Sequence, residues 1–119
     1  MAGLYDLGEN PFYEGNLERT FLSAVLSGGK IPAEITVEHF RVSDNRLVFL
    51  ALKRLEKLEI GSSLHGAVVL YLSGSGCMTK AQAEPAVKRI EALSGDPRFI
   101  NAYARELILQ NLRRTAIHG

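Results

Sequence analysis

The feature that most constrains this chain is a run of six consecutive apolar residues, 47–52, inside the segment 43–58. Ser43 is placed to cap a first helical turn, and Asp44 follows where the helix dipole favours negative charge. The length of about four turns and the unbranched Leu, Lys and Glu side chains favour a helix over a strand. A helix that is apolar all round must be enclosed by other elements. The segment therefore predicts the central core helix of a folded domain.

The composition predicts one domain of ordinary globular type. The chain has 119 residues, of which 46% are hydrophobic and 23% charged, and this is enough to bury a core without disulfides. The net charge of +1 excludes a strong overall field, so a nucleic-acid or anionic-membrane role needs a local basic patch. Cys77 is the only cysteine, and neither a signal peptide nor an apolar run of membrane-spanning length is visible. We expect a cytoplasmic protein with no membrane partner.

The first part of the chain predicts an arm followed by a helical domain. Residues 1–15 contain glycines and scattered aromatics, which is typical of an extended N-terminal arm. The domain then covers residues 16–116 and begins with a helix that Asn16 caps. Gly28 and the glycine after it supply the left-handed end of this helix. Thr36 is predicted to cap a single turn before the central helix.

The segment 64–72 fits two kinds of element. Its last six residues are apolar, are followed by glycines and include the β-branched pair Val68 and Val69, which fits a short buried strand. A helix that starts at Ser62 or Ser63 fits as well, with a broad apolar face that includes Leu70. We prefer the helix, because the chain offers no second strand for pairing.

Two helices joined by a tight turn are predicted at the C-terminus. Thr79 and Gln82 form a capping-box pair that opens a short turn, and Pro85 marks a fresh helix start that runs to Leu93. An Asp-Pro pair at 96–97 opens the last helix, which extends to about residue 116. Its core stripe is Ile100, Tyr103, Ala104, Leu107, Ile108 and Leu112. Together these patterns predict an all-α fold, a compact bundle of six or seven short helices with a C-terminal helical hairpin.

No constellation of residues points to catalysis. The glycines that follow the segment 64–72 imitate a nucleotide loop, but a phosphate-binding loop ends Gly-Lys-Ser/Thr, and a dinucleotide loop needs a third glycine where Thr79 stands. We interpret this stretch as a flexible interhelical loop. His39, His65 and His118 lie far apart, with no Cys or carboxylate at ligand spacing. We therefore predict no enzyme, no catalytic residue, no cofactor and no metal.

Four short patterns follow one another along most of the chain: 17–26 LERTFLSAVL, 35–40 ITVEHF, 45–55 NRLVFLALKRL and 101–108 NAYARELI. Their order and spacing resemble the opening helix, the Leu-x-x-x-x-Phe turn, the His-Arg-x-Ile-Phe-x-Ala-Met-x-x-Leu central helix and the Asn-x-x-Tyr-Ala-x-x-Val final helix of one family. This family is the N-terminal domain of replicative DNA helicases of the DnaB type. The chain departs from its pattern at Ser23, where the family has Gly, and at residues 62–63.

The resemblance implies a non-catalytic module of DNA replication. In the family this domain pairs with its copies through the C-terminal hairpin, forms the collar of a hexameric ring, docks the primase or a helicase loader, and meets DNA only indirectly. The ATPase motor lies in a separate domain, so a full-length parent would be an ATP-dependent DNA helicase. The helicase-binding domain of bacterial primases has a related helical fold and stays an alternative.

Self-association through the hairpin needs apolar side chains beyond the core stripe. The candidates are whichever of Leu93, Phe99, Tyr103 and Leu109 the fold leaves exposed. The alternative is that all four belong to the core.

The last helix also carries a basic bias, with several arginines against the single acid Glu106. Cations in a last helical turn complement the helix dipole, which is a sufficient structural explanation. The alternative function is a small helical DNA-binding protein that uses Arg105, Arg113 and Arg114 and whose binding weakens steeply with salt.

Overall fold

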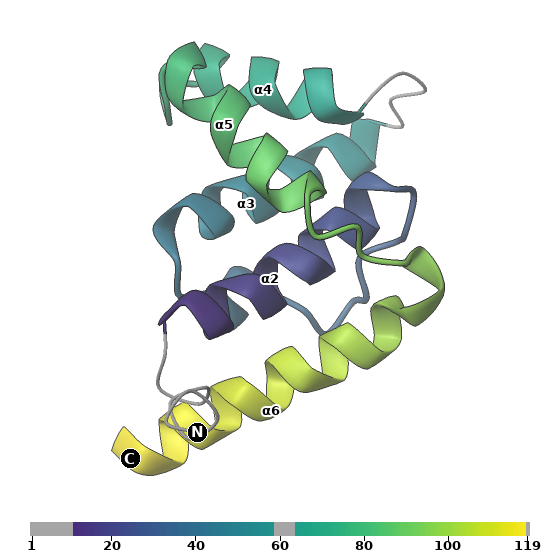
Figure 1. Cartoon of the computed structure of the whole chain (residues 1–119), viewed down its shortest axis with the longest axis vertical. Helices are drawn as coiled ribbons and strands as arrows, with labels where there is room; N and C mark the ends of the chain where they lie inside the picture. Colours follow the sequence, from purple (N-terminus) through teal and green to yellow (C-terminus); the bar gives the residue numbers. More distant parts are fainter. Residues whose placement is uncertain (1–10, 59–63, 119) are drawn as a thin grey trace.

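The centre of the fold is α2 (Pro11–Leu26), which contacts the three helices α3, α5 and α6 (Figure 1). The computed structural model describes residues 11–58 and 64–118, and of residues 11–14 and 116–118 the backbone alone. The expected arm over residues 1–15 lies mostly outside this range, and residues 11–15 form the first part of α2. The first helix therefore begins at Pro11 rather than at Asn16.

The described residues form helices and no strands. The remaining elements, in chain order, are η1 (Val37–His39), α3 (Ser43–Leu58), α4 (Leu64–Gly74), α5 (Lys80–Glu91), η2 (Pro97–Phe99) and α6 (Ile100–His118). The radius of gyration of 14.3 Å is close to the value of about 13.5 Å expected for a compact chain of this length. The predicted all-α class is confirmed, whereas the count of six or seven short helices and the C-terminal hairpin are not.

The C-terminal end of α2 is formed by two consecutive glycines. Gly28 has a φ of 112°, its N–H donates to the Val25 carbonyl oxygen, and the N–H of Gly29 donates to that of Ala24. This pair of hydrogen bonds is a Schellman motif. It ends α2 at the position that the two glycines in the sequence predict. The segment 64–72, for which the sequence allowed a strand or a helix, belongs to the helix α4. Its predicted start at residues 62–63 lies outside the described residues.

A second predicted helix start, at Pro85, is also wrong. Pro85 does not begin a helix but lies inside α5, which starts at Lys80. The capping box between Thr79 and Gln82 is confirmed: Thr79 Oγ1 accepts the Gln82 N–H at 3.2 Å, and Gln82 Oε1 accepts the Thr79 N–H at 3.0 Å. The helix runs through Pro85 without a hydrogen bond from this residue to the Ala81 carbonyl, because proline has no N–H.

The core joins α2, α3 and the loop that follows η1 through three aromatic rings. The Phe40 ring lies 6.0 Å from that of Phe21 and 4.8 Å from that of Phe49, and all three side chains are buried. Around them α3 buries one face only. Leu50, in the middle of its apolar run, is 46% exposed. The central helix is thus α2 and not α3, because α3 has neighbours on one side alone.

The two C-terminal helices lie on different sides of α2 (Figure 1). α5 packs on α4 and α2, whereas α6 packs on α2 and η2. The connection between them is held on α2 by a hydrogen bond of 2.6 Å from the buried Gly95 N–H to Ser23 Oγ. A Cβ at Gly95 would overlap the Thr20 carbonyl oxygen, so only glycine permits this approach. Ser94, with a φ of 50°, turns the chain into it.

Candidate interaction surface

The side of α6 that faces away from α2 is a mixed apolar and charged surface. Ile100, Ala104 and Leu107 are buried against α2. Leu109 and Leu112 remain 38% and 56% exposed. Helical spacing places them beside four other exposed residues. We define the outer face of α6 by six residues: Ala102, Arg105, Glu106, Leu109, Leu112 and Arg113.

The structure separates the four residues predicted for self-association. Leu109 belongs to the outer face of α6, and Phe99 is 55% exposed at the start of the helix, about 15 Å away along the axis. Leu93 and Tyr103 are half-buried. The sequence interpretation missed Leu112, which it placed in the core stripe. Its position only at the edge of that stripe on a helical projection is the signal that could have found it.

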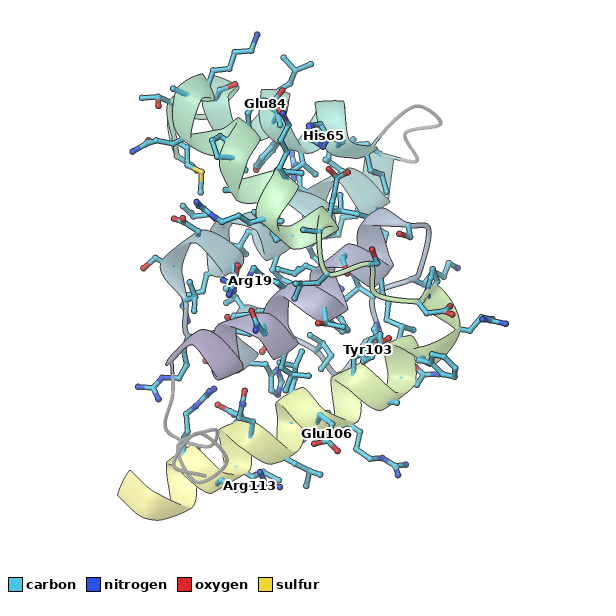
Figure 2. The ribbon with its side chains drawn as sticks, in the orientation of Figure 1. Arg19, His65, Glu84, Tyr103, Glu106 and Arg113 are labelled. Carbon is cyan, nitrogen blue, oxygen red and sulfur yellow. The ribbon has the colours of Figure 1, made fainter. Side chains whose placement is uncertain are left out.

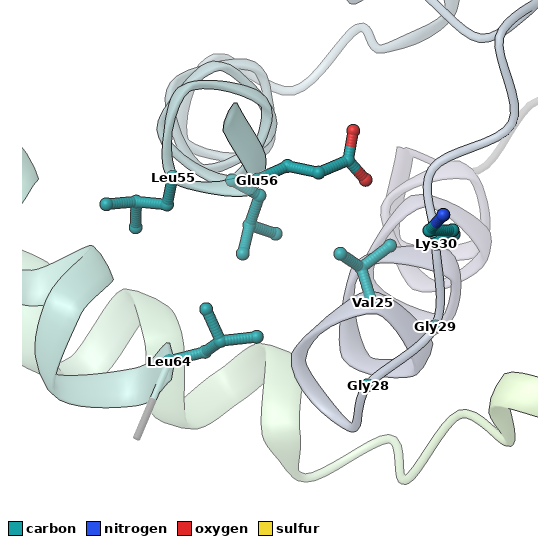
Figure 3. A pocket seen from close by; sticks show the side chains of 8 residues that line it. Val25, Gly28, Gly29, Lys30, Leu55, Glu56 and Leu64 are labelled. Atoms are coloured by element: carbon teal, nitrogen blue, oxygen red, sulfur yellow. The ribbon is translucent and has the colours of Figure 1, made fainter. Parts of the chain in front are cut away.

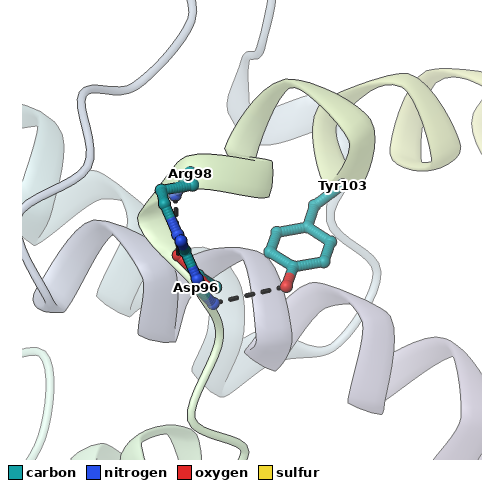
Figure 4. A network of polar contacts seen from close by, with 3 residues as sticks. All are labelled: Asp96, Arg98 and Tyr103. Atoms are coloured by element: carbon teal, nitrogen blue, oxygen red, sulfur yellow. Dashed lines mark hydrogen bonds and ion pairs between the residues drawn. The ribbon is translucent and has the colours of Figure 1, made fainter.

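The Tyr103 side chain stabilises the turn that leads into α6 and is not part of a free apolar surface. Its hydroxyl oxygen accepts the Asp96 N–H at 3.3 Å (Figure 4). Asp96 caps η2 by accepting the Arg98 N–H at 2.9 Å, and its carboxylate lies 2.8 Å from the Arg98 guanidinium. The hydrogen bonds from the Arg98 side chain, and then from its backbone, lower the pKa of Asp96. Asp96 is thus a cap, as predicted, but it caps η2, and the last helix α6 begins only at Ile100.

The arginines predicted for DNA contact have two kinds of environment. Arg105 and Arg113 are exposed on the outer face of α6. Arg114 is half-buried, and its Nη2 donates to Asn111 Oδ1 at 3.3 Å. Glu106 lies between the two exposed arginines along the helix. The arrangement alternates in sign, so it differs from a continuous basic surface.

A second polar cluster joins α4 to α5 around His65 (Figure 2). His65 Nδ1 lies 2.7 Å from Glu91 Oε1, and Nε2 lies 2.9 Å from Glu84 Oε2. Sequence spacing did not predict this cluster, because both carboxylates come from another helix. The hydrogen bond to Glu84 is the main cause of the raised pKa of His65, and the same bond lowers the pKa of Glu84.

A pocket of about 190 Å³ lies where α2 ends beside α3 and α4 (Figure 3). Val25, Leu52, Leu55 and Leu64 give it apolar walls, and Lys30 and Glu56 stand at its edge. The Glu56 carboxylate accepts the Ile31 N–H at 3.1 Å, so it serves the loop after α2. The pocket therefore has one polar group already engaged in the fold.

The glycine loop after α4 has a structural role. Gly76 adopts a φ of 82°, the Met78 N–H donates to the Leu72 carbonyl at 3.2 Å, and Met78 is buried. Thr79 caps α5, as described above. In the described part of the chain no group of three or more His, Cys, Asp or Glu side chains is arranged to hold a metal ion. Within the same residues no helix is both long and apolar enough to cross a bilayer.

Comparison with known proteins finds no family model, no curated protein and no solved structure that matches this chain.

Proposed function

We propose that this chain is a non-catalytic self-association and protein-interaction module that pairs through the outer face of α6. The observation that carries the proposal is the exposure of Leu109 and Leu112 next to charges of both signs. Burying an exposed leucine side chain contributes about 1.5 to 3 kcal/mol at most, and four leucines would be covered in a symmetric pair. The proposed surface belongs to α6 alone and does not include the rest of the predicted hairpin over residues 85–116. The reason is that α5 packs on α4 and α2.

The charges on this face support an antiparallel pair. Glu106 and Arg113 are exposed, and they lie seven positions apart, about 10 Å along one helix, which is too far for an ion pair within it. In two antiparallel copies of α6 that cross between residues 109 and 110, Glu106 of each copy lies opposite Arg113 of the other. Leu109 then lies at the crossing point. A two-fold axis requires such a self-complementary patch.

The sequence resemblance supplies the biological setting of the proposal. A module that pairs with its copies and docks a primase or a helicase loader matches the N-terminal domain of DnaB-type replicative helicases. In that setting the chain acts in DNA replication in the cytoplasm, as part of a dimer or a ring, and ATP hydrolysis belongs to another domain of the parent helicase.

The test is the molar mass in solution, measured by light scattering over a wide concentration range. We expect the wild type to form a dimer or a larger assembly and Leu109→Lys to stay monomeric. Leu70→Lys is the matched control, since Leu70 is 70% exposed on α4, remote from α6 in sequence. A wild-type monomer at every concentration, or equal dissociation by both variants, would overturn the proposal.

A further inference from the structure

Cations predominate on the solvent side of α3. Leu50 is exposed among them, and Leu58 is exposed at the end of the helix. Arg46, Arg54 and Lys57 are exposed, Lys53 is half-buried, and all four lie on the side opposite the buried Val48, Leu52 and Leu55. Their spacing of three, four and seven to eight positions places them on one helical face around Leu50. We define the basic face of α3 by Arg46, Leu50, Lys53, Arg54 and Lys57.

The acidic residues of α3 point away from this face. The Asp44 carboxylate lies 3.7 Å from Arg89 of α5, and the Glu56 carboxylate accepts the Ile31 N–H from the loop after α2. Among the described residues, no carboxylate lies within ion-pairing distance of Lys53, Arg54 or Lys57. Arg46 Nη1 donates to the Phe40 carbonyl at 2.9 Å, which orients its guanidinium without neutralising it. The basic face thus keeps four positive charges, although the net charge of the chain is only +1.

We propose that the basic face of α3 binds the phosphate backbone of double-stranded nucleic acid. From Arg46 to Lys57 it extends about 16 Å, the length over which one strand of a duplex presents about five phosphates. Four cations along this length match that charge density. This partner goes beyond self-association, and it is assigned to α3 rather than to the arginines of α6, because α6 alternates in sign.

The composition of the face selects the duplex over other anionic partners. Proteins that bind single strands without sequence preference stack bases on aromatic side chains, and the basic face has none. A membrane-surface helix inserts several large apolar side chains along one face, whereas Leu50 is the one large apolar residue among these cations and the exposed Leu58 follows only at the end of α3. Contacts between cations and phosphates position a protein on a duplex without reading its sequence. Binding is therefore expected to be independent of sequence.

The test measures binding to a fluorescent duplex of mixed sequence by anisotropy as salt rises from about 50 to about 200 mM. Four phosphate contacts predict that log K falls with log salt at a slope of about 3 to 4, a loss of about 100-fold over this range. The variant Lys53→Gln/Arg54→Gln/Lys57→Gln is expected to bind at least about 100-fold more weakly at low salt, with a slope near about 1. Circular dichroism and thermal unfolding confirm that the variant keeps the wild-type fold.

A second triple variant, Lys30→Gln/Lys80→Gln/Lys88→Gln, removes the same charge from the loop after α2 and from α5. It is expected to keep the wild-type slope. Equal weakening by both triple variants would reduce the effect to net charge and overturn the assignment to α3. No duplex binding by the wild type, tighter binding to a single strand, or binding only to vesicles rich in phosphatidylserine would overturn it too.

Discussion

The buried carboxylate of Glu18 on α2 accepts a hydrogen bond of 3.0 Å from the side-chain amide of Asn45 on α3. Glu18 is fully buried and Asn45 is 2% exposed. The same carboxylate accepts the N–H groups of Arg41, at 2.8 Å, and Val42, at 3.3 Å, where the chain enters α3. Three donors compensate for the desolvation of one charge, and they hold α3 against α2.

Removing the charge of Glu18 is expected to destabilise the fold. In Glu18→Gln an amide NH₂ replaces one carboxylate oxygen and faces a backbone or side-chain donor, so about 2 kcal/mol of unfolding free energy is lost. Urea unfolding measures the change. Glu34→Gln, at an exposed turn, serves as the control and should leave the midpoint in place. A Glu18→Gln midpoint equal to that of the wild type would mean that the buried hydrogen bonds contribute little.

Two glycines are expected to respond to alanine in opposite directions. Gly95→Ala places a Cβ against the Thr20 carbonyl oxygen and 2.5 Å from Ser23 Oγ, so we expect a loss of about 2 to 3 kcal/mol. Gly66 lies inside α4 with open space around it, and Gly66→Ala should stabilise the fold by about 0.5 to 1 kcal/mol through helix propensity. Thermal unfolding compares the two. A tolerated Gly95→Ala would show that the approach to Ser23 is not close in solution.

The His65 cluster predicts a stability that depends on pH. The ionised carboxylates of Glu84 and Glu91 can only accept hydrogen bonds, so both ring nitrogens of His65 must donate. The imidazole is therefore protonated when both contacts form. The raised pKa of His65 stabilises the fold fully below its ordinary value of 6.5, and this contribution is lost as pH rises through the higher folded pKa. The lowered pKa of Glu84 acts oppositely, with its contribution present above 4.5 and lost as pH falls through the lower folded pKa.

The contribution of His65 is therefore largest between these two values. Because Glu84 and Glu91 are 41% and 42% exposed, solvent screening limits it to about 0.5 to 1 kcal/mol. His65→Gln should lower the urea midpoint at pH near 5.5 and match the wild type at alkaline pH. His39→Gln is the control, because Gln at this position of the capping box keeps a side-chain acceptor for the Thr36 N–H. A difference between His65→Gln and wild type that does not change with pH would contradict the protonated contact.

The antiparallel pairing of α6 predicts that two charges compensate for each other. Glu106→Arg and Arg113→Glu each place like charges opposite each other and should weaken self-association, by about tenfold or more. The double variant restores both opposite-charge pairs and should recover most of the wild-type affinity in sedimentation equilibrium. If Leu109→Lys abolishes association, the Glu106→Arg/Arg113→Glu variant can still fail to regain the wild-type affinity. That combination would support the outer face of α6 as the interface and contradict the antiparallel register.

Several local features could be predicted from the sequence because they depend on residues close together in the chain. The Schellman end at Gly28, the capping box of Thr79 and Gln82, and the cap at Asp96 each form within a few positions. Pro85 was misplaced because α5 continues through it, whereas proline is normally confined to the first turn of a helix. The burial of Glu18 gave no signal, since a glutamate early in a helix normally lies in solvent.

The sequence by itself determined that the chain is helical and where most helices end, because propensity, capping and glycine act over a few residues. Only the tertiary structure decided which side chains face solvent. Leu50 and Leu112 are exposed, while Glu18 and Ser23 are buried, because α2 docks simultaneously with α3, α5 and α6. The contacts responsible join residues as far apart as Ser23 and Gly95. Such docking depends on the fit of whole helix surfaces, which no single segment of the chain encodes.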